Sequence, residues 1–385
     1  MNLIPEIVSF APELKRIRQD IHANPEIGFE EKRTSSLVAD MLTGWGVEVH
    51  RNIGGTGVVG ILRGHAPGRR IGLRADMDAL PMQEATGLPY SSRNPNAFHG
   101  CGHDGHTTIL LGAARYLAET RRFSGEVVLI FQPAEEGLGG AQRMLADGLF
   151  KRFPCDEIYG LHTWPNAPVG RVSLTPGPAM AAADSFDIII TGRGSHGAQP
   201  HYSVDPVMVA VSLAQALQTV VSRNINPLKT AILSITQIHA GSAHNVIPDT
   251  ARLSGTIRTF DDGVRAFIAE RMKTLADSIA AGFGASAELI LDSRFSVLIN
   301  SPQQSDAAIA IARDLVGASL AEFDTDPLTG SEDFADMLHH VPGAYMLLGQ
   351  GPGPNLHNPK FDFNDEVAPI GASLLARIAE ARTAS

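Results

Sequence analysis

The first half of the chain alternates between helical and strand patterns, and this alternation constrains the fold more than any other feature. Two helical patterns, over 5–22 and 30–45, come before two short apolar runs with the composition of strands, over 57–62 and 71–74. The alternation continues with helix, strand, helix and strand patterns over 106–120, 126–131, 140–147 and 157–162. Strands that alternate with helices predict an α/β fold in which helices cover both faces of a mixed sheet.

The middle of the chain has a different order of patterns. From residue 184 to residue 292 the order is strand, helix, strand, strand, helix, strand, which is typical of the ferredoxin-like arrangement. The earlier alternation resumes from Pro302 and ends in a closing helix near 364–382. We therefore expect an α+β domain over 181–295 that is inserted into a discontinuous domain made of 1–180 and 296–385.

Composition and charge exclude several classes of protein. The formal net charge is −10, and no run of Lys and Arg is longer than a pair, which argues against nucleic acid and anionic membranes as partners. The first residues lack the basic head and apolar run of a signal peptide, and no stretch approaches the length that spans a membrane. With two cysteines, Cys101 and Cys155, no disulfide framework is expected. These features favour a cytoplasmic enzyme.

One octapeptide, residues 99–106, carries three imidazoles, a thiol and a carboxylate between glycines. Thiolate and imidazole are the ligands that zinc and its neighbours prefer, so Cys101 and His103 are candidate metal ligands. The alternatives are a buried thiol beside a surface histidine, or a nucleophilic Cys–His pair, although catalytic pairs of that kind usually lie apart in sequence. We expect His99 and His106 to support the loop rather than to bind metal.

Further chemistry-bearing residues stand at the ends of the predicted strands. Asp76 and Asp78 follow one strand, Glu135 and Glu136 follow another, and His162 closes a third. Ligand and catalytic sites of α/β sheets collect at the carboxyl ends of strands, so these side chains are expected at one place. Two adjacent acids are more often a solvated turn, but beside a metal loop one carboxylate can bind metal while its neighbour accepts a proton.

Three loops outside these strands also carry candidates. His357 lies on a loop rich in glycine and proline, over 349–359. His196 and Asn245 lie in polar segments of the middle region, where ordinary turn chemistry is the alternative. Ser331 comes shortly before a predicted helix, where it either caps the helix or helps to hold a substrate carboxylate.

Taken together, these segments resemble the clan of di-metal aminoacylases and carboxypeptidases. Within the clan they resemble the hippurate hydrolase, or N-acyl-amino-acid amidohydrolase, subfamily, which includes auxin-conjugate hydrolases and N-acetyldiaminopimelate deacetylases. The resemblance covers nearly the whole chain and rests on the segments 21–26, 73–81, 99–106, 132–136, 194–198, 245–249, 330–334 and 356–358. It implies a zinc-exopeptidase-like fold in which the inserted domain serves as a lid and as a dimerisation domain.

The resemblance also implies two divalent metal ions per subunit, which are Mn, Zn, Ni or Co in the family. The implied ligands are Cys101, His103, Glu136, His162 and His357, with Cys101 as the bridge between the metals.

The remaining residues then take supporting or catalytic roles. Glu135 is implied as the general base for a metal-activated water. Other branches of the clan have a histidine where this chain has Asp76, so Asp78 is expected to orient a ligand rather than to bind. His196 is implied to reach the scissile carbonyl, in its own or in the partner subunit's site, with Asn245 near the substrate.

The implied reaction is hydrolysis of the amide bond of N-acyl-L-amino acids, hippurate-like or N-acetylated, to a carboxylic acid and a free amino acid. A homodimer or a dimer-based oligomer is implied as well. The alternatives are a dipeptidase or carboxypeptidase of the same clan, a hydrolase with Cys101 as nucleophile, and a non-catalytic metal-binding protein.

Overall fold

The structure is a computed structural model that describes residues 1–384. The chain divides into two compact units. Unit 1 comprises Met1–Ala179, Ile299–Pro327 and Asp333–Ser385, and unit 2 comprises Met180–Leu298 and Leu328–Glu332. A short two-stranded sheet pairs β7 (Gly177–Met180) with β14 (Leu298–Asn300).

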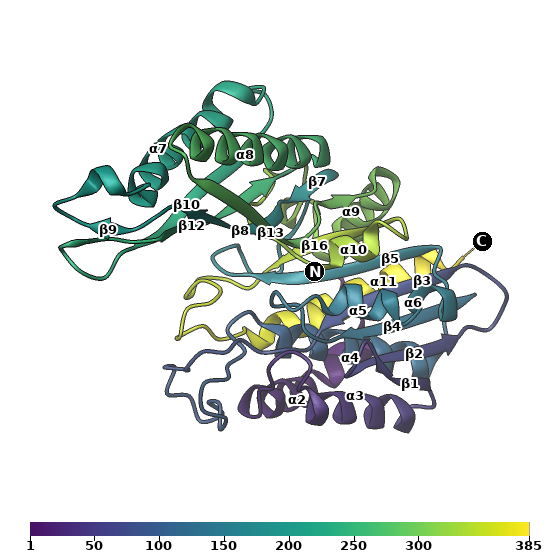
Figure 1. Cartoon of the computed structure of the whole chain (residues 1–385). Coiled ribbons are helices and arrows are strands. Elements are labelled where there is room, and N and C mark those ends of the chain that lie inside the picture. Colours follow the sequence, from purple (N-terminus) through teal and green to yellow (C-terminus); the bar gives the residue numbers. More distant parts are fainter. Residues whose placement is uncertain (385) are drawn as a thin grey trace. The chain divides into compact units, whose positions relative to one another are not determined.

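Unit 1 is built on an eight-stranded mixed sheet with the order β1-β2-β4-β3-β5-β16-β6-β15 (Figure 1). The strands are β1 (Glu48–Ile53), β2 (Gly57–Arg63), β3 (Arg70–Asp76), β4 (Glu126–Gln132), β5 (Glu157–Trp164), β6 (Val172–Leu174), β15 (Ala321–Phe323) and β16 (Gly343–Gly349). The four central neighbours, β4, β3, β5 and β16, are parallel to one another. Their carboxyl ends therefore lie along one edge, where α/β sheets place their sites.

Helices cover both faces of this sheet, because the parallel strands are apolar on both sides. The helices of unit 1 are α1 (Pro5–Ser9), α2 (Ala11–Ala23), α3 (Lys32–Gly44), α4 (His103–Thr120), α5 (Gly140–Ala146), α6 (Leu149–Arg152), α9 (Pro302–Val316), α10 (Phe334–Leu338) and α11 (Ala368–Arg382). Alternate residues of β4, namely Val127, Leu129 and Phe131, join one core with α4 and α11. On the other face, α5 contacts β4 and packs against α10.

Helix α4 is buried on almost every side, since it packs against β3 and against α2 and α11. Small residues permit this close packing. A Cβ atom at Gly105, in the first turn, would lie 2.2 Å from the ring of Phe363, so this position requires glycine. The helix thereby carries its first residue, His103, into the interior of unit 1.

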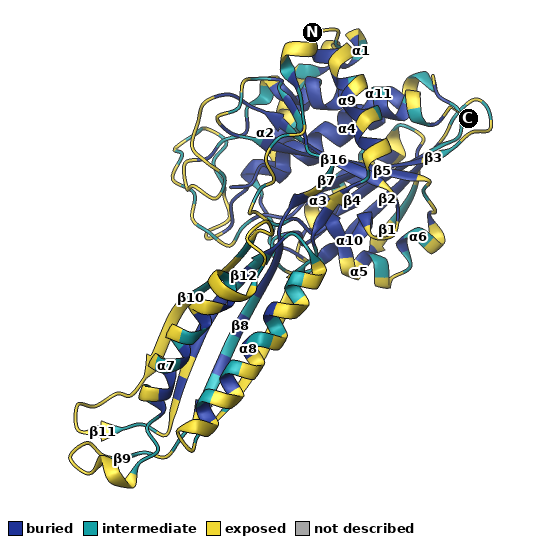
Figure 2. Ribbon diagram, turned by 90° about the horizontal axis from the view of Figure 1, so that it is seen from above, coloured by how far each residue is buried: buried dark blue, intermediate teal, exposed yellow. Residues whose placement is uncertain are grey.

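Unit 2 is a four-stranded antiparallel sheet, ordered β10-β12-β8-β13, with two helices packed against it. Along the chain its main elements are β8 (Ala182–Thr191), α7 (Pro206–Thr219), β10 (Ala231–Ala240), β12 (Thr250–Thr259), α8 (Asp262–Gly282) and β13 (Ser286–Phe295). In Figure 2 the buried residues of α7 and α8 face the sheet, and their outer faces are exposed. Asp205 and Asp261 cap the two helices through hydrogen bonds from Val207 and Val264.

The predicted helix over 5–22 is wrong in one respect, because the structure divides it at Phe10. Pro12 lies at the start of α2, where a missing N–H is tolerated, but inside a continuous helix its ring would clash with the preceding turn. The short strands β1, β6 and β15 and the ribbon of β9 (Ser195–His196) with β11 (Val246–Ile247) were not predicted. In residues 1–384 no helix has both the length and the apolar composition needed to cross a membrane.

Candidate metal centre

The candidate residues of unit 1 converge at the carboxyl edge of its four parallel strands. Asp76 ends β3, and Asp78 follows it by two residues. Glu135 and Glu136 follow β4, and His162 lies near the end of β5. The octapeptide leads into α4, and the loop after β16 carries His357.

Two overlapping groups of donor atoms form there. The ligand atoms of Cys101, His103 and His162 lie within 4.8 Å of one another, and those of Cys101, Glu136 and His357 do so as well. The Cys101 thiol lies 3.4 Å from Nε2 of His162, and Nε2 of His357 lies 3.4 Å from Oε1 of Glu136. Cys101 is common to both groups. The structure therefore brings together the five residues that the resemblance implies as ligands.

Two of the imidazoles are oriented by partners on their far side. Nδ1 of His162 lies 2.7 Å from the carbonyl oxygen of Thr163, and since a carbonyl only accepts, Nδ1 carries the proton. Nδ1 of His103 lies 3.2 Å from Oδ1 of Asp78, which accepts in the same way. In both rings Nε2 faces the cluster, that of His103 toward Glu136 and that of His162 toward the Cys101 thiol. Burial also lowers the pKa of His162 well below its usual value, which keeps the ring neutral.

The donor set fits a divalent cation. Nε2 of His103 and Oε1 of Glu136 are buried, lie 3.9 Å apart and make no hydrogen bond within residues 1–384, although Oε1 also lies 3.4 Å from Nε2 of His357. Buried polar atoms without a partner are destabilising, and a cation between them would satisfy both. Burial raises the pKa of the Cys101 thiol, so a thiolate at this position needs a nearby positive charge. Thiolate, imidazole and carboxylate together suit zinc and its neighbours.

A further carboxylate lies beside these groups. Glu135 is buried, with 6% of its surface exposed, and one of its oxygens falls within 4.8 Å of donor atoms of His103 and Glu136. The neighbouring residue, Glu136, is held by a hydrogen bond of its own: its backbone N–H donates to Oδ2 of Asp78 at 3.0 Å. The turn therefore presents two neighbouring acids to the same cluster.

His106 has both ring nitrogens engaged by other groups of the protein. Nδ1 lies 2.7 Å from Oδ1 of Asp76, and Nε2 accepts the backbone N–H of Thr163 at 2.9 Å. Asp76 in turn accepts a hydrogen bond from the fully buried Arg74 at 2.7 Å. These contacts connect α4 with β3 and β5.

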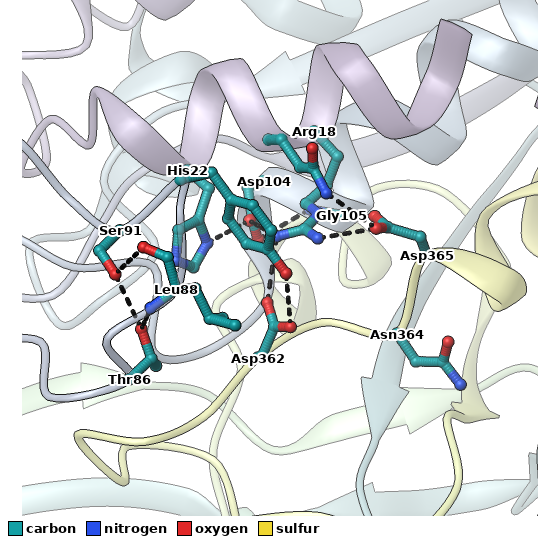
Figure 3. Close-up of polar contacts among 12 residues, drawn as sticks. Arg18, His22, Thr86, Leu88, Ser91, Asp104, Gly105, Asp362, Asn364 and Asp365 are labelled. Carbon is teal, nitrogen blue, oxygen red and sulfur yellow. Dashed lines mark hydrogen bonds and ion pairs between the residues drawn. The ribbon is translucent and has the colours of Figure 1, made fainter. Parts of the chain in front are cut away.

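A buried network of charges supports the start of α4 from the other side (Figure 3). Arg18, with a fully buried side chain, donates to both oxygens of Asp365 and to Asp362, and its guanidinium lies 3.7 Å from Asp104. Nδ1 of His22 lies 2.7 Å from Oδ2 of Asp104. Burial disfavours the charged ring, but the charge and hydrogen bond of Asp104 outweigh it and raise the pKa of His22 to about 9.

Sequence reasoning missed most of this network. Arg18 lies on the apolar stripe of α2, between Leu14 and Ile21, where a charged residue signals a buried partner. That signal was available in the sequence. The identity of its partners was not, because Asp362 and Asp365 are more than 340 residues away along the chain.

The other three candidates lie in unit 2. His196 is on β9 and pairs with Val246 of β11, and the N–H of Gly197 donates to the carbonyl oxygen of Asn245 at 2.7 Å. Nδ1 of His196 accepts the N–H of Ala198 at 3.1 Å, so its proton is on Nε2. The ribbon thus holds His196 and Asn245 together on an exposed segment.

Ser331 is not the cap of the helix that follows it. The residue at the cap position of α10 is Asp333. The Ser331 hydroxyl is buried and has no hydrogen-bond partner in the part of the chain that the structure describes.

Buried thiol, imidazole and carboxylate donors in two overlapping groups, with one more carboxylate alongside, are the arrangement of a metal-dependent hydrolase. The sequence profile of peptidase family M20/M25/M40 matches residues 72–381 of this chain. The chain belongs to this family, as the sequence predicted.

The names of similar proteins agree with this assignment. The chain is 43% identical over 379 residues to a hippurate hydrolase from Campylobacter jejuni, across 98% of this chain and 99% of the relative. It is 41% identical over 363 residues to an N-acetyl-L-cysteine deacetylase from Bacillus subtilis, across 94% of this chain and 86% of the relative. A solved structure, a dinuclear metal binding peptidase of the M20 family from Bacillus subtilis, matches with a TM-score of 0.85 and 33% identity, across 98% of this chain and 99% of that one. The chain is a metal-dependent amidohydrolase, and the predicted α/β fold is confirmed.

Proposed function

We propose that this chain hydrolyses the amide bond of N-acyl-L-amino acids, with hippurate-like and N-acetyl compounds as the substrate class, to a carboxylic acid and a free amino acid. Two relatives whose names describe such reactions support the substrate class. The observation that carries the proposal is the pair of donor groups that share Cys101, with the buried Glu135 beside them.

In this proposal two divalent ions would be held by Cys101, His103, Glu136, His162 and His357, and Cys101 would serve both donor groups. When bound, two such ions act as Lewis acids on the amide carbonyl and on the attacking water. Asp78 positions His103 and the backbone of Glu136 and does not itself bind.

Glu135 is the proposed general base. Its carboxylate accepts a proton from the attacking water and delivers that proton to the nitrogen of the leaving amino acid. Burial beside His103 and Glu136 keeps it at the reacting centre, with little solvent to compete for the proton.

His196, Asn245 and Ser331 are the proposed substrate contacts. Because Nδ1 of His196 accepts from Ala198, its Nε2–H is a donor suited to the oxyanion that develops on the scissile carbonyl. Asn245 lies beside His196 on the ribbon. The Ser331 hydroxyl is free to form a hydrogen bond with a substrate.

The inserted segment, over 181–295, is proposed as a lid and dimerisation domain. Strand β10 supports this role, because it is a ten-residue edge strand of the four-stranded sheet of unit 2 and exposes Ile238 by 53%. Long exposed edges that carry apolar side chains are sites of strand pairing between chains. Ile238→Lys is expected to shift the chain from dimer toward monomer in analytical ultracentrifugation.

Glu135→Gln tests the catalytic proposal. The amide keeps the shape of the side chain but is not a base, so metal content is expected to stay unchanged while turnover of N-benzoylglycine falls by about 100-fold or more. Asp40→Asn, an exposed carboxylate on α3, is the control and should behave as wild type. Near-normal turnover of Glu135→Gln would refute the assignment. Free dipeptides in the same assay separate this activity from that of a dipeptidase.

A further inference from the structure

The turn that carries Glu135 and Glu136 has an unusual backbone conformation. Ala134 adopts φ of 53°, in the left-handed region that residues with a side chain rarely occupy. Such a conformation persists only where surrounding contacts hold it in place, and it is found most often at functional sites. The contacts that hold Ala134 therefore decide where the next two carboxylates point.

Both polar backbone groups of Ala134 are bound. Its N–H donates to Oε1 of Glu31 at 2.8 Å, and its carbonyl oxygen accepts the N–H of Gly140 at 3.0 Å. The second carboxylate oxygen of Glu31 accepts a hydrogen bond from the hydroxyl of Thr56. Glu31 is fully buried, and its partners come from the segment before β2 and the segment after β4.

The ordinary interpretation of an acid at this position is a helix cap. Glu31 is the residue that precedes α3, where a carboxylate often accepts the N–H groups of the first helical turn. Its side chain makes no such bond. The carboxylate is directed instead to the backbone of Ala134, 103 residues further along the chain.

The backbone near Glu31 also packs directly against the turn. A Cβ atom at Gly28 would lie 2.9 Å from both Cα and Cβ of Ala134, which is closer than real side chains approach. Residues 28–31 therefore hold Ala134 by a close packing contact at one end and by a hydrogen bond at the other.

We propose that Glu31 is a positioning residue of the reaction: it fixes the left-handed conformation of Ala134 and so directs Glu135 and Glu136 toward the donor groups. The proposal rests on the function proposed above for those two carboxylates. The carboxylate of Glu31 bonds to Thr56 and to the peptide of Ala134, neither of which is a proposed ligand, and it acts through that peptide.

The test compares Glu31→Ala with Glu31→Gln in the full chain, by Zn²⁺ affinity in competition with a chelator and by kcat and KM for N-benzoylglycine. The alanine variant loses the bond to Ala134, so we expect Zn²⁺ affinity and kcat each to fall by about 10- to 100-fold, with KM much less affected. The glutamine variant should restore both, because its amide oxygen accepts from Ala134 and its amino group donates to the Thr56 hydroxyl.

A matched control separates positioning from general loss of stability. Glu157 is an equally buried acid at the amino end of β5, and its partners include Tyr159 and Arg382. Glu157→Ala should lower the melting temperature but leave Zn²⁺ affinity and kcat of the folded protein unchanged. If Glu31→Ala does not fold, Gly28→Ala provides the same test, because its added methyl group displaces Ala134 while Glu31 is intact.

Wild-type Zn²⁺ affinity and kcat in folded Glu31→Ala would overturn the proposal, and so would a Glu31→Gln variant as impaired as Glu31→Ala. The two proposals fail in different ways. A wild-type chain that hydrolyses no N-acyl amino acid refutes the proposed function, whereas the Zn²⁺ affinities still test the position of Glu136.

Discussion

Oδ1 of Asp78 lies 3.2 Å from Nδ1 of His103. The other oxygen of the same carboxylate accepts the backbone N–H of Glu136 at 3.0 Å. One buried side chain thus orients an imidazole and an acidic turn that belong to different segments, after β3 and after β4. Partners of this kind fix the tautomer and direction of a ligand and raise its basicity.

Asp78→Ala is therefore expected to weaken Zn²⁺ binding by about 10- to 100-fold, although no proposed ligand is removed. Titration against a chromophoric chelator measures this. Asp40→Ala serves as the control, because Asp40 is exposed and pairs with Arg51 at the surface. An affinity equal to that of the wild type would mean that His103 and Glu136 keep their positions without Asp78.

Arg18→Met is expected to destabilise unit 1. The methionine fills a similar volume but leaves Asp104, Asp362 and Asp365 without their shared cation. Removal of one partner from a buried ion pair costs about 3–5 kcal/mol, because the remaining charge stays uncompensated. Thermal unfolding at fixed metal concentration measures the loss.

Arg33→Met is the matched control for Arg18. Arg33 bonds both oxygens of Asp20, but both side chains are exposed, so the loss should be below about 1 kcal/mol. Equal melting temperatures for the two variants would contradict the prediction that the buried network around Arg18 stabilises the fold more than the surface pair of Arg33 and Asp20 does.

Acid should weaken the attachment of the C-terminal helix α11 to β5. Burial alone would raise the pKa of Glu157, but hydrogen bonds from Arg382, Tyr159 and Gln304 outweigh it and lower this pKa to about 2. The unfolded value is about 4.3, so this carboxylate stabilises the fold above that pH. The contribution disappears as the pH falls from about 4 toward 2.

Glu157→Gln should therefore lower the melting temperature at neutral pH, and its difference from wild type should shrink as the pH falls below about 4. Melting curves in the presence of chelator, across this pH range, check the expectation without interference from bound metal. Glu119→Gln is the control, since Glu119 pairs with Arg115 at the surface and contributes little at any pH. A difference that does not depend on pH would show that the charge of Glu157 is not the cause.

The strand–helix alternation predicted the α/β fold because it is a local signal, and the acids after β3 and β4 could be found because they follow predicted strands. Glu31 could not be assigned in this way, because a charged residue just before a helix usually faces solvent. Arg18 lies on the apolar stripe of α2, which signals burial but does not identify its partners. Their partners are 103 and up to 347 residues away, and only the folded chain brings them together. The left-handed backbone conformation of Ala134 could not be predicted from the sequence, since alanine has no preference for it. The β9–β11 ribbon is too short to show a strand pattern.

The most direct test of the account measures bound metal and hydrolysis of N-benzoylglycine in the same samples, after a chelator has stripped the chain and Zn²⁺ or Mn²⁺ has been added back. We expect the stripped chain to be inactive and the reloaded chain to bind two ions and to regain activity, whereas Cys101→Ser binds fewer ions and regains little. Full activity of the metal-free chain, or of Cys101→Ser, would contradict the claim that hydrolysis depends on metal ions held by the two donor groups that have Cys101 in common.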